Sequence, residues 1–256
     1  MSKALGLVWL MVMTAMPPAL GAELTAERVH EILAAASPKW PADLSGKSLE
    51  NLDLSNFDFG RANLSRANLF GAKLVGADFS RANLSGAKLD LAWIMRANFT
   101  DANLSNASLL GLVVASGLDY SPAEAPTFRG ANFSGAHVLA RLGRFDLRGA
   151  NFTGARMGAD MTNQSMGLMR SDLSGADLAG ANFAKADLSR ALLRFAKLGG
   201  ANMAEANLAG ADLSGADLTG ADLTGANATE ADFGGAVLTN ARGLGTMKGW
   251  RPPQQR

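Results

Sequence analysis

The chain has 256 residues, no cysteine and a formal net charge of +1. Because cysteine is absent, a disulfide framework and a lipid anchor on cysteine are both excluded. The nearly even balance of acidic and basic residues predicts neither nucleic-acid binding nor a uniformly acidic surface.

Residues 1–22 have the layout of a secretory signal peptide, with Lys3 ahead of an apolar run over residues 4–16. The small residues Gly21 and Ala22 then offer a cleavage site. The apolar run is short for a membrane span, and no later segment is long enough for one. We therefore expect cleavage near Gly21 or Ala22 and an exported chain, secreted or periplasmic, whose side-chain charge is 0 once Lys3 is removed.

Residues 23–41 predict a short helix followed by a linker. Thr25 suits the N-cap position and Glu27 the first turn, while Ser37-Pro38 ends the pattern. One face of this helix is apolar and carries Val29, Ile32, Leu33 and Ala36. Such a face must cover another part of the chain.

A five-residue pattern, Ala-(Asp/Asn)-(Leu/Phe)-x-x, begins at Ala42 and is still present at Phe233. Its large apolar residue recurs in one phase at Leu44, Leu49, Leu54, Phe59, Leu64, Leu69, Leu74, Phe79, Leu84, Leu89, Ile94, Phe99, Leu104 and Leu109. A period of five fits neither a helix nor a flat strand. Regular self-similarity over so many copies instead indicates a solenoid, in which each unit buries its apolar face by stacking on its neighbours.

Over residues 42–241 the chain resembles the pentapeptide-repeat family. The resemblance implies an all-β fold, a right-handed quadrilateral parallel β-helix with four pentapeptides in each coil. It also implies that the central Leu or Phe and the small residue two positions before it point inward. A methyl group suits that inward corner because a larger side chain would overpack it.

If one coil takes twenty residues, side chains twenty apart should stack at the spacing of hydrogen-bonded strands. Phe59, Phe79 and Phe99 are spaced in this way and should form a ladder of offset rings. At the start of the solenoid, Leu52 and Phe57 replace the small inward residue. We expect them to present an apolar surface to the helix of residues 23–41, which would cap the open end.

The repeat is regular over residues 42–109 and again over 171–241. With two short blocks of three units in the section between, there are about 34 units in all. The section between, residues 110–170, loses its phase around 110–127, 140–144 and 158–170. These units predict roughly eight coils and a rod on the order of 40 Å long. The tail, residues 242–256, contains Trp250, which could close the last coil.

Insertions in a solenoid leave it as loops, which either fold back on the wall or carry binding. The insertion at 110–127 contains the only tyrosine, and bases cluster just after it. We therefore expect a partner to contact Tyr120, Arg141 and Arg144. No catalytic residue is predicted, because His30 and His137 are the only histidines and belong to no recognisable catalytic motif.

Four methionines crowd into a short stretch of the irregular section, at Met157, Met161, Met166 and Met169. Thioether sulfur suits Cu(I), so a metal site is one interpretation. Methionine also fills irregular cores well, and Met157 keeps the phase of the repeat. Core packing is the interpretation we favour, with no metal and no cofactor expected.

Charge is distributed unevenly along the rod. Residues 42–109 carry seven acids and seven bases, whereas residues 171–238 carry nine acids and four bases. Some pentapeptide-repeat proteins imitate duplex DNA and engage type II topoisomerases, but such a mimic needs an acidic surface over its whole length. The local bases Arg141, Arg144, Arg148, Arg156 and Arg170 have no interleaved aromatic residues, so nucleic-acid binding is not predicted.

The sequence favours a non-enzymatic exported scaffold that binds a protein or another cell-envelope partner. Two alternatives remain open: a periplasmic protein that binds a metal or small ligand, and a DNA mimic that binds a topoisomerase. A solenoid end with a weak cap could also pair two copies into a homodimer.

Overall fold

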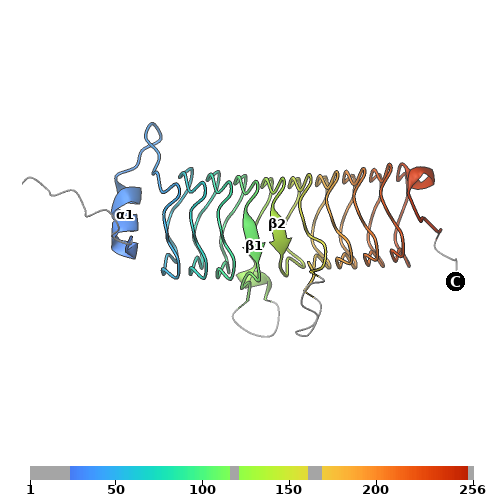
Figure 1. Ribbon diagram of the computed structural model, residues 1–256, viewed down its shortest axis with the longest axis horizontal. Helices are drawn as coiled ribbons and strands as arrows, with labels where there is room; N and C mark the ends of the chain where they lie inside the picture. The colour runs from blue at the N-terminus through green and yellow to red at the C-terminus, as the bar shows by residue number, and fades with distance from the viewer. Residues whose placement is uncertain (1–23, 116–120, 161–168, 253–256) are drawn as a thin grey trace, which may run out of the picture.

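The pentapeptides form the walls of a four-sided parallel β-helix. The computed structural model describes residues 24–115, 121–160 and 169–252, and it shows an elongated rod with α1 at one end and the C-terminal segment at the other (Figure 1). We name the four faces by the first residue of each ladder: Asp43 begins face 1, Ser48 face 2, Asp53 face 3 and Asp58 face 4.

Face 1 shows how long the rod is. Its ladder of parallel bridges runs through Asp43, Asn63, Asn83, Asn103, Asn132, Asn151, Asn182, Asn202, Asp222 and Arg242. Nine steps of about 4.8 Å give a length on the order of 40 Å, as the repeat predicted.

The core contains the residues that the repeat assigned to it. The large apolar residues from Leu44 to Leu109 are all 0 or 1% exposed, and the alanines from Ala62 to Ala107 are at most 2% exposed. The predicted aromatic ladder is confirmed, with ring centroids 4.7 Å apart for Phe59 and Phe79 and 4.9 Å apart for Phe79 and Phe99. A second stack continues on face 1 through Phe133, Phe152 and Phe183.

Each corner of the rod is a tight turn. In the first unit the Lys47 amide donates to the Leu44 carbonyl, and Gly46 between them has a φ of 64°. The equivalent corner residue has a positive φ throughout the regular walls, which explains the many glycines there. Sixteen non-glycine residues in the described ranges also hold a positive φ, among them Phe195, which has a φ of 55° and 70% of its surface exposed.

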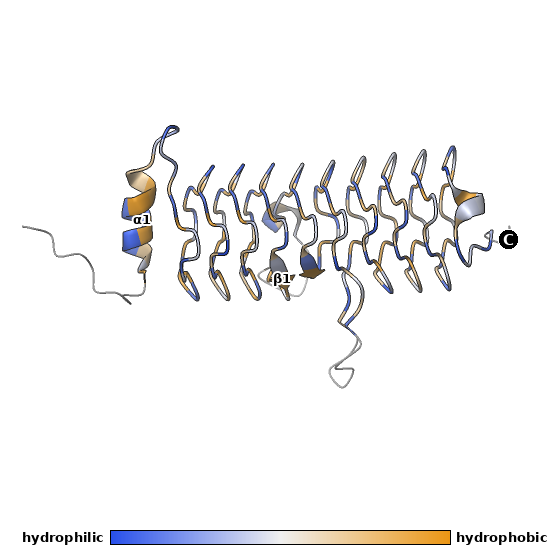
Figure 2. Cartoon of the chain, turned by 45° about the horizontal axis from the view of Figure 1, so that its top comes forward, coloured by the Kyte–Doolittle hydropathy of each residue, from blue (hydrophilic) through white to orange (hydrophobic). Residues whose placement is uncertain are grey.

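The helix α1 spans Ala26–Ala34, close to the sequence prediction. The Thr25 side chain accepts a hydrogen bond from the Arg28 amide at 3.3 Å, as an N-cap residue does. The apolar side of α1 faces the first coil (Figure 2), where Val29 is fully buried and His30 contacts the edge of the Phe57 ring. At the other end, Trp250 packs against Phe233 at 4.9 Å.

Two strands of three residues each, β1 (Ser108–Leu110) and β2 (His137–Leu139), pair in parallel on face 2 at the irregular section. Two short 3-10 helices, Pro122–Glu124 and Leu244–Thr246, complete the elements of the described residues. No helix in the described ranges is long and apolar enough to cross a membrane.

Candidate functional site

Face 3 is interrupted in the middle of the rod. Its ladder runs through Asp53, Lys73, Trp93 and Val113, and it starts again with Arg141 and Asp172. Faces 1, 2 and 4 have continuous ladders through the same region. Among the described residues, the step from Val113 to Arg141 is therefore the one place where two successive strands of an interior coil do not pair.

The coil after the interruption is one residue short. Val138 and Leu142 both occupy core positions, but they are four residues apart where the regular units have five. The missing residue is the one that turns the corner, and none of residues 139–142 has a positive φ. This coil takes nineteen residues from Asn132 to Asn151, and its face 3 strand pairs with Asp172 in the following coil but not with Val113 in the coil before it.

Ser171 compensates for the lost turn. In regular units the carbonyl of the large core residue accepts a hydrogen bond from the amide three positions later. The Val138 carbonyl instead accepts one from the Ser171 hydroxyl at 2.7 Å. Ser171 stands at an inward position that is usually alanine, and it is 0% exposed. A buried carbonyl that would otherwise lack a partner is satisfied in this way.

Phe145 compensates for the lost volume. It occupies the inward corner before Leu147, where regular units have alanine, and it is 1% exposed. A corner that accepts a benzyl group must have more room than the others. Gly143 lies beside the next coil, and a Cβ atom there would stand 2.9 Å from the Ser174 carbonyl oxygen. Three residues that are unusual for their positions, Ser171, Phe145 and Gly143, thus allow the irregular coil to pack against its neighbours.

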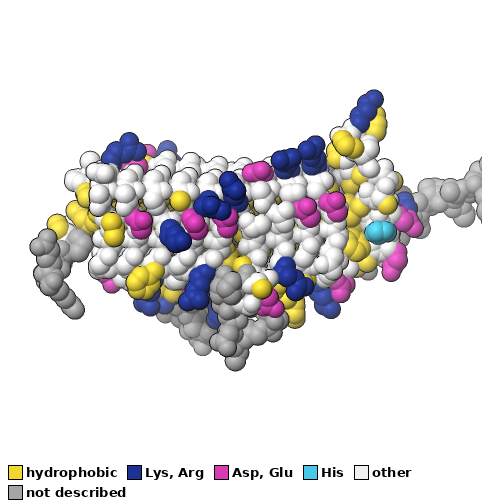
Figure 3. Space-filling view, turned by 180° about the vertical axis from the view of Figure 1, so that it is seen from behind, with side chains coloured by type: hydrophobic (Ala, Val, Ile, Leu, Met, Phe, Trp, Pro, Cys, Tyr) yellow, Lys and Arg dark blue, Asp and Glu magenta, His cyan; other side chains and the backbone are white. Residues whose placement is uncertain are grey.

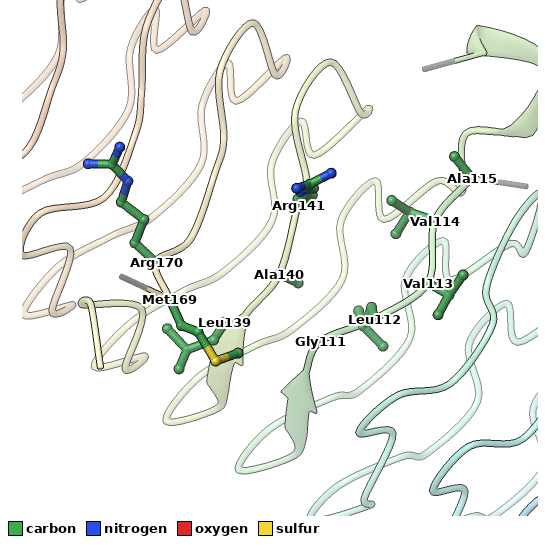
Figure 4. A pocket seen from close by; sticks show the side chains of 10 residues that line it. All are labelled: Gly111, Leu112, Val113, Val114, Ala115, Leu139, Ala140, Arg141, Met169 and Arg170. Atoms are coloured by element: carbon green, nitrogen blue, oxygen red, sulfur yellow. The ribbon is translucent and has the colours of Figure 1, made fainter. Parts of the chain in front are cut away.

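A cavity of about 490 Å³ lies where the two strands fail to pair. One wall is formed by residues 111–115 and the other by residues 139–141, with Met169 and Arg170 at the side (Figure 4). Leu112, Leu139 and Ala140 are 7, 6 and 5% exposed and form an apolar floor. We call this cavity the fork.

The fork opens onto an apolar strip on the corner between faces 2 and 3. Leu91 is 49% exposed and Trp93 is 41% exposed, and Trp93 is the ladder neighbour of Val113 in the fork wall. Phe70, one coil earlier, is 37% exposed. Exposed apolar residues that lie together next to a cavity often mark a binding surface.

Two of the three predicted partner residues lie in the irregular coil. Arg141 lies in the wall of the fork and is exposed. Arg144 lies at the next corner of the same coil with a φ of 62°, and its side chain runs toward Gly175 in the following coil. Tyr120 lies outside the described residues. The sequence identified the irregular coil but not Leu112 or Leu139, because a one-residue deletion shows only as a shift of phase. It singled out Met169 only as a possible metal ligand and not as a residue beside a cavity.

The methionine hypothesis stays a prediction. Met157 is a fully buried core residue of face 2, whereas Met169 is 49% exposed beside the fork. Met161 and Met166 lie outside the described residues. Within the described ranges no group of three or more His, Asp or Glu side chains could hold a metal ion.

His137 lies on β2, on the outer side of face 2. Burial lowers the pKa of this imidazole, and the Arg156 guanidinium lowers it further, while the carboxylates of Asp90 and Asp160 act in the opposite direction. The net effect favours the neutral imidazole. His30 lies in α1 at the N-terminal end of the rod, whereas His137 is the fifth residue of the face 2 ladder, so the two histidines do not meet.

Charges of both signs are intermingled on the wall seen from behind (Figure 3). Charged side chains also pair on the described rod: Arg148 binds Asp146 at 2.6 Å, and Arg194 binds Asp212. The Arg148 guanidinium lowers the pKa of the Asp146 carboxyl group by a direct hydrogen bond. The rod therefore shows a mixed surface on this side and not one continuous acidic face.

Sequence comparison assigns the family. The model of pentapeptide repeats matches residues 42–80, 62–101, 171–208 and 201–240, which together make up half of the chain. The chain belongs to the pentapeptide-repeat family, and its fold is the right-handed quadrilateral β-helix that the repeat predicted. Proteins of this family are generally structural or binding modules without catalytic activity. A search of curated proteins found no match.

Among solved structures, similar chains include HetL, a pentapeptide-repeat protein involved in heterocyst differentiation regulation in the cyanobacterium Nostoc sp. strain PCC 7120. It is 28% identical, with 88% of this chain and 97% of HetL covered and a TM-score of 0.40. Rfr23 from the cyanobacterium Cyanothece 51142 is 26% identical, with coverage of 56% and 89% and a TM-score of 0.32. QnrB1, a plasmid-mediated fluoroquinolone resistance protein, is 21% identical in a trypsin-treated form, with coverage of 77% and 84% and a TM-score of 0.39.

Proposed function

We propose that this chain is a non-enzymatic scaffold that binds a protein partner through the irregular middle of its rod. The observation that carries the proposal is the fork, where an apolar floor, an exposed arginine and an adjoining apolar strip meet in a single interrupted coil. Elsewhere in the described walls the outward residues serve mainly as turn formers and as members of polar ladders.

Several features support a rigid role for the rod. Asparagine amides are hydrogen-bonded from coil to coil on face 1, from Asn63 to Asp43 at 3.0 Å and onward to Asn151. The buried side of α1 supports a capping role at the N-terminal end, because an uncovered coil would expose both core and strand edges.

Export is part of the proposal and is supported by the signal-like composition of residues 1–22. Expression of the full chain in a bacterium with two membranes, followed by N-terminal sequencing of the periplasmic fraction, tests it. We expect a mature chain that begins close to Ala22. A full-length chain confined to the cytoplasm would contradict export while leaving the binding proposal intact.

Affinity capture from periplasmic extract tests the binding proposal. Arg141→Ala and Met169→Glu change exposed side chains of the fork, and each should weaken capture of the partner at least tenfold. Lys197→Ala is the matched control, because Lys197 is an exposed cation at the same position of the pentapeptide, on face 4 of a regular coil. Equal capture by all three variants, each with an unchanged melting temperature, would place the binding surface elsewhere.

A further inference from the structure

We propose that the fork binds an extended polypeptide segment as an added β-strand, with an acidic side chain of that segment paired with Arg141. The inference rests on the proposed function and deepens it, since it names the kind of partner surface that the fork takes. Three features of the fork carry it: its shape, its unpaired backbone groups and the chemistry of its side chains.

The fork is closed at one end and open at the other. At its closed end β1 and β2 pair, with Leu110 opposite Leu139 and the Gly111 amide donating to the Leu139 carbonyl at 2.8 Å. Beyond this point the two chains diverge toward Val114 and Arg141 (Figure 4). The cavity is therefore a wedge between two extended strands, and extended backbone is the shape that complements it.

Both sides of the wedge present backbone groups that regular coils use for pairing. In the preceding coil the Ile94 amide donates to the Val113 carbonyl, and the Val113 amide donates to Ala92. The corresponding groups at the fork are the Leu112 carbonyl, the Val114 amide and both backbone groups of Arg141. None of these has a hydrogen-bond partner among the described residues.

These groups make each side of the fork a strand edge. Extended peptides bind to such edges through main-chain hydrogen bonds, and pockets for alternate side chains add specificity. A segment in the fork would meet a donor and an acceptor on both sides. Nucleic acid and small anions lack the alternating donors and acceptors that would pair with two such edges.

The side chains define which segment fits. Leu112 and Leu139 line the floor, and the flexible Met169 thioether lies at the edge, so alternate residues of the segment should be apolar. Arg141 is exposed, and no carboxylate of a described residue lies within 4.0 Å of its guanidinium group. An acidic residue in the segment would supply that partner.

A displayed library of random linear decapeptides, selected on the mature chain, supplies the probe. We expect selected sequences to alternate apolar residues with at least one Asp or Glu. Methylation of alternate backbone nitrogens in a selected peptide should weaken its binding at least tenfold, because a strand needs those amides. On binding, hydrogen exchange at the Val114 and Arg141 amides should slow.

Two variants separate the backbone from the side chain. Arg141→Ala removes only the guanidinium group, whereas Arg141→Pro also removes the unpaired amide, so Arg141→Pro should bind the peptide roughly fivefold more weakly than Arg141→Ala. Asp172→Pro is the contrast in the next coil, because the Asp172 amide is bonded to the Ala140 carbonyl at 3.1 Å and its loss should lower the melting temperature.

The inference is overturned if N-methylated and unmodified peptides bind equally well, or if binding leaves exchange at Val114 and Arg141 unchanged. Either readout stands even if Arg141→Pro fails to fold. Partner capture that is lost in Arg141→Ala, together with peptides insensitive to N-methylation, would uphold the proposed function and reject strand addition.

Discussion

Ser171 shows how a single side chain repairs a fault in the repeat. Its hydroxyl replaces a backbone amide as the donor to the Val138 carbonyl, at a position where most other coils carry alanine. The hydroxyl is therefore expected at this coil and at no regular one. Its contribution to stability is that of a buried hydrogen bond whose loss leaves an unpaired carbonyl.

We predict that Ser171→Ala lowers the free energy of unfolding by about 1–3 kcal/mol, because it leaves the Val138 carbonyl without a donor. Urea denaturation followed by circular dichroism measures the loss. Ser174→Ala is the control, since this serine points outward in the same coil, and it should change stability by less than about 0.5 kcal/mol. A loss as small as that of Ser174→Ala would show that the Ser171 hydroxyl is not needed.

The lowered pKa of His137 predicts how the free energy of unfolding depends on pH. Its folded pKa lies below the ordinary value of 6.5, so the unfolded chain binds more protons in the window just below pH 6.5. The stability linked to this group is complete above that window and falls as the pH is lowered through it. Between pH 7.5 and 5.5, His137→Gln should therefore lose less stability than the original chain in parallel denaturation curves. An identical loss in both chains would show that His137 does not contribute.

At the scale of the elements, the stacked rings explain why neighbouring coils hold a common register. Phe79 lies between Phe59 and Phe99 with interplanar angles of 2° and 3°. Each ring is fully buried, so it contributes apolar burial as well as the favourable offset geometry. The stack ends on face 4 at Phe128, just before the irregular coil, and the next stack begins on face 1 at Phe133.

We predict that Phe79→Ala lowers the free energy of unfolding by about 3–5 kcal/mol, since it leaves a cavity inside a closely packed stack. Phe70→Ala is the matched control, because Phe70 is an outward residue of the same coil, and its effect should stay below about 1 kcal/mol. Thermal unfolding of both variants measures the difference. Similar melting temperatures would mean that the coil collapses around the missing ring.

At the scale of the whole molecule, the twenty-residue period determines which deletions leave the rod folded. Deletion of residues 202–221 removes one coil and joins Ala201 to Asp222, which restores the pattern of the repeat. We predict a folded rod with a slightly lower melting temperature. Deletion of residues 202–220 leaves one extra residue and should destabilise the chain far more. Calorimetry of the two deletions tests this, and equal stability would show that the period is not strict.

Most of the fold could be predicted from sequence because each unit repeats the same physical solution. The inward leucines and alanines, the aromatic ladder and the helix near Thr25 all followed from local patterns. Val114 and Leu142 were harder to place. They keep core positions on face 3 although their neighbours break the pattern, so the chain stays on the wall through Ala115.

The fork could not be predicted, because it depends on two strands that lie 28 residues apart between Val113 and Arg141 and fail to pair. The sequence shows that a residue is missing after Val138, but it does not show whether the coil closes the gap or leaves it open. That outcome depends on the packing of Phe145 and Ser171 against the following coil.

The missing pairing on face 3 also affects the cooperativity with which the rod unfolds. In a solenoid, stability is approximately the sum of terms for each coil and for each contact between neighbouring coils. The contact across the fork has three continuous ladders where contacts between the other complete coils have four, and it lacks two backbone hydrogen bonds worth about 1 kcal/mol each. Nearest-neighbour coupling is therefore weakest there. The N-terminal and C-terminal halves should behave as two cooperative units that share one continuous backbone.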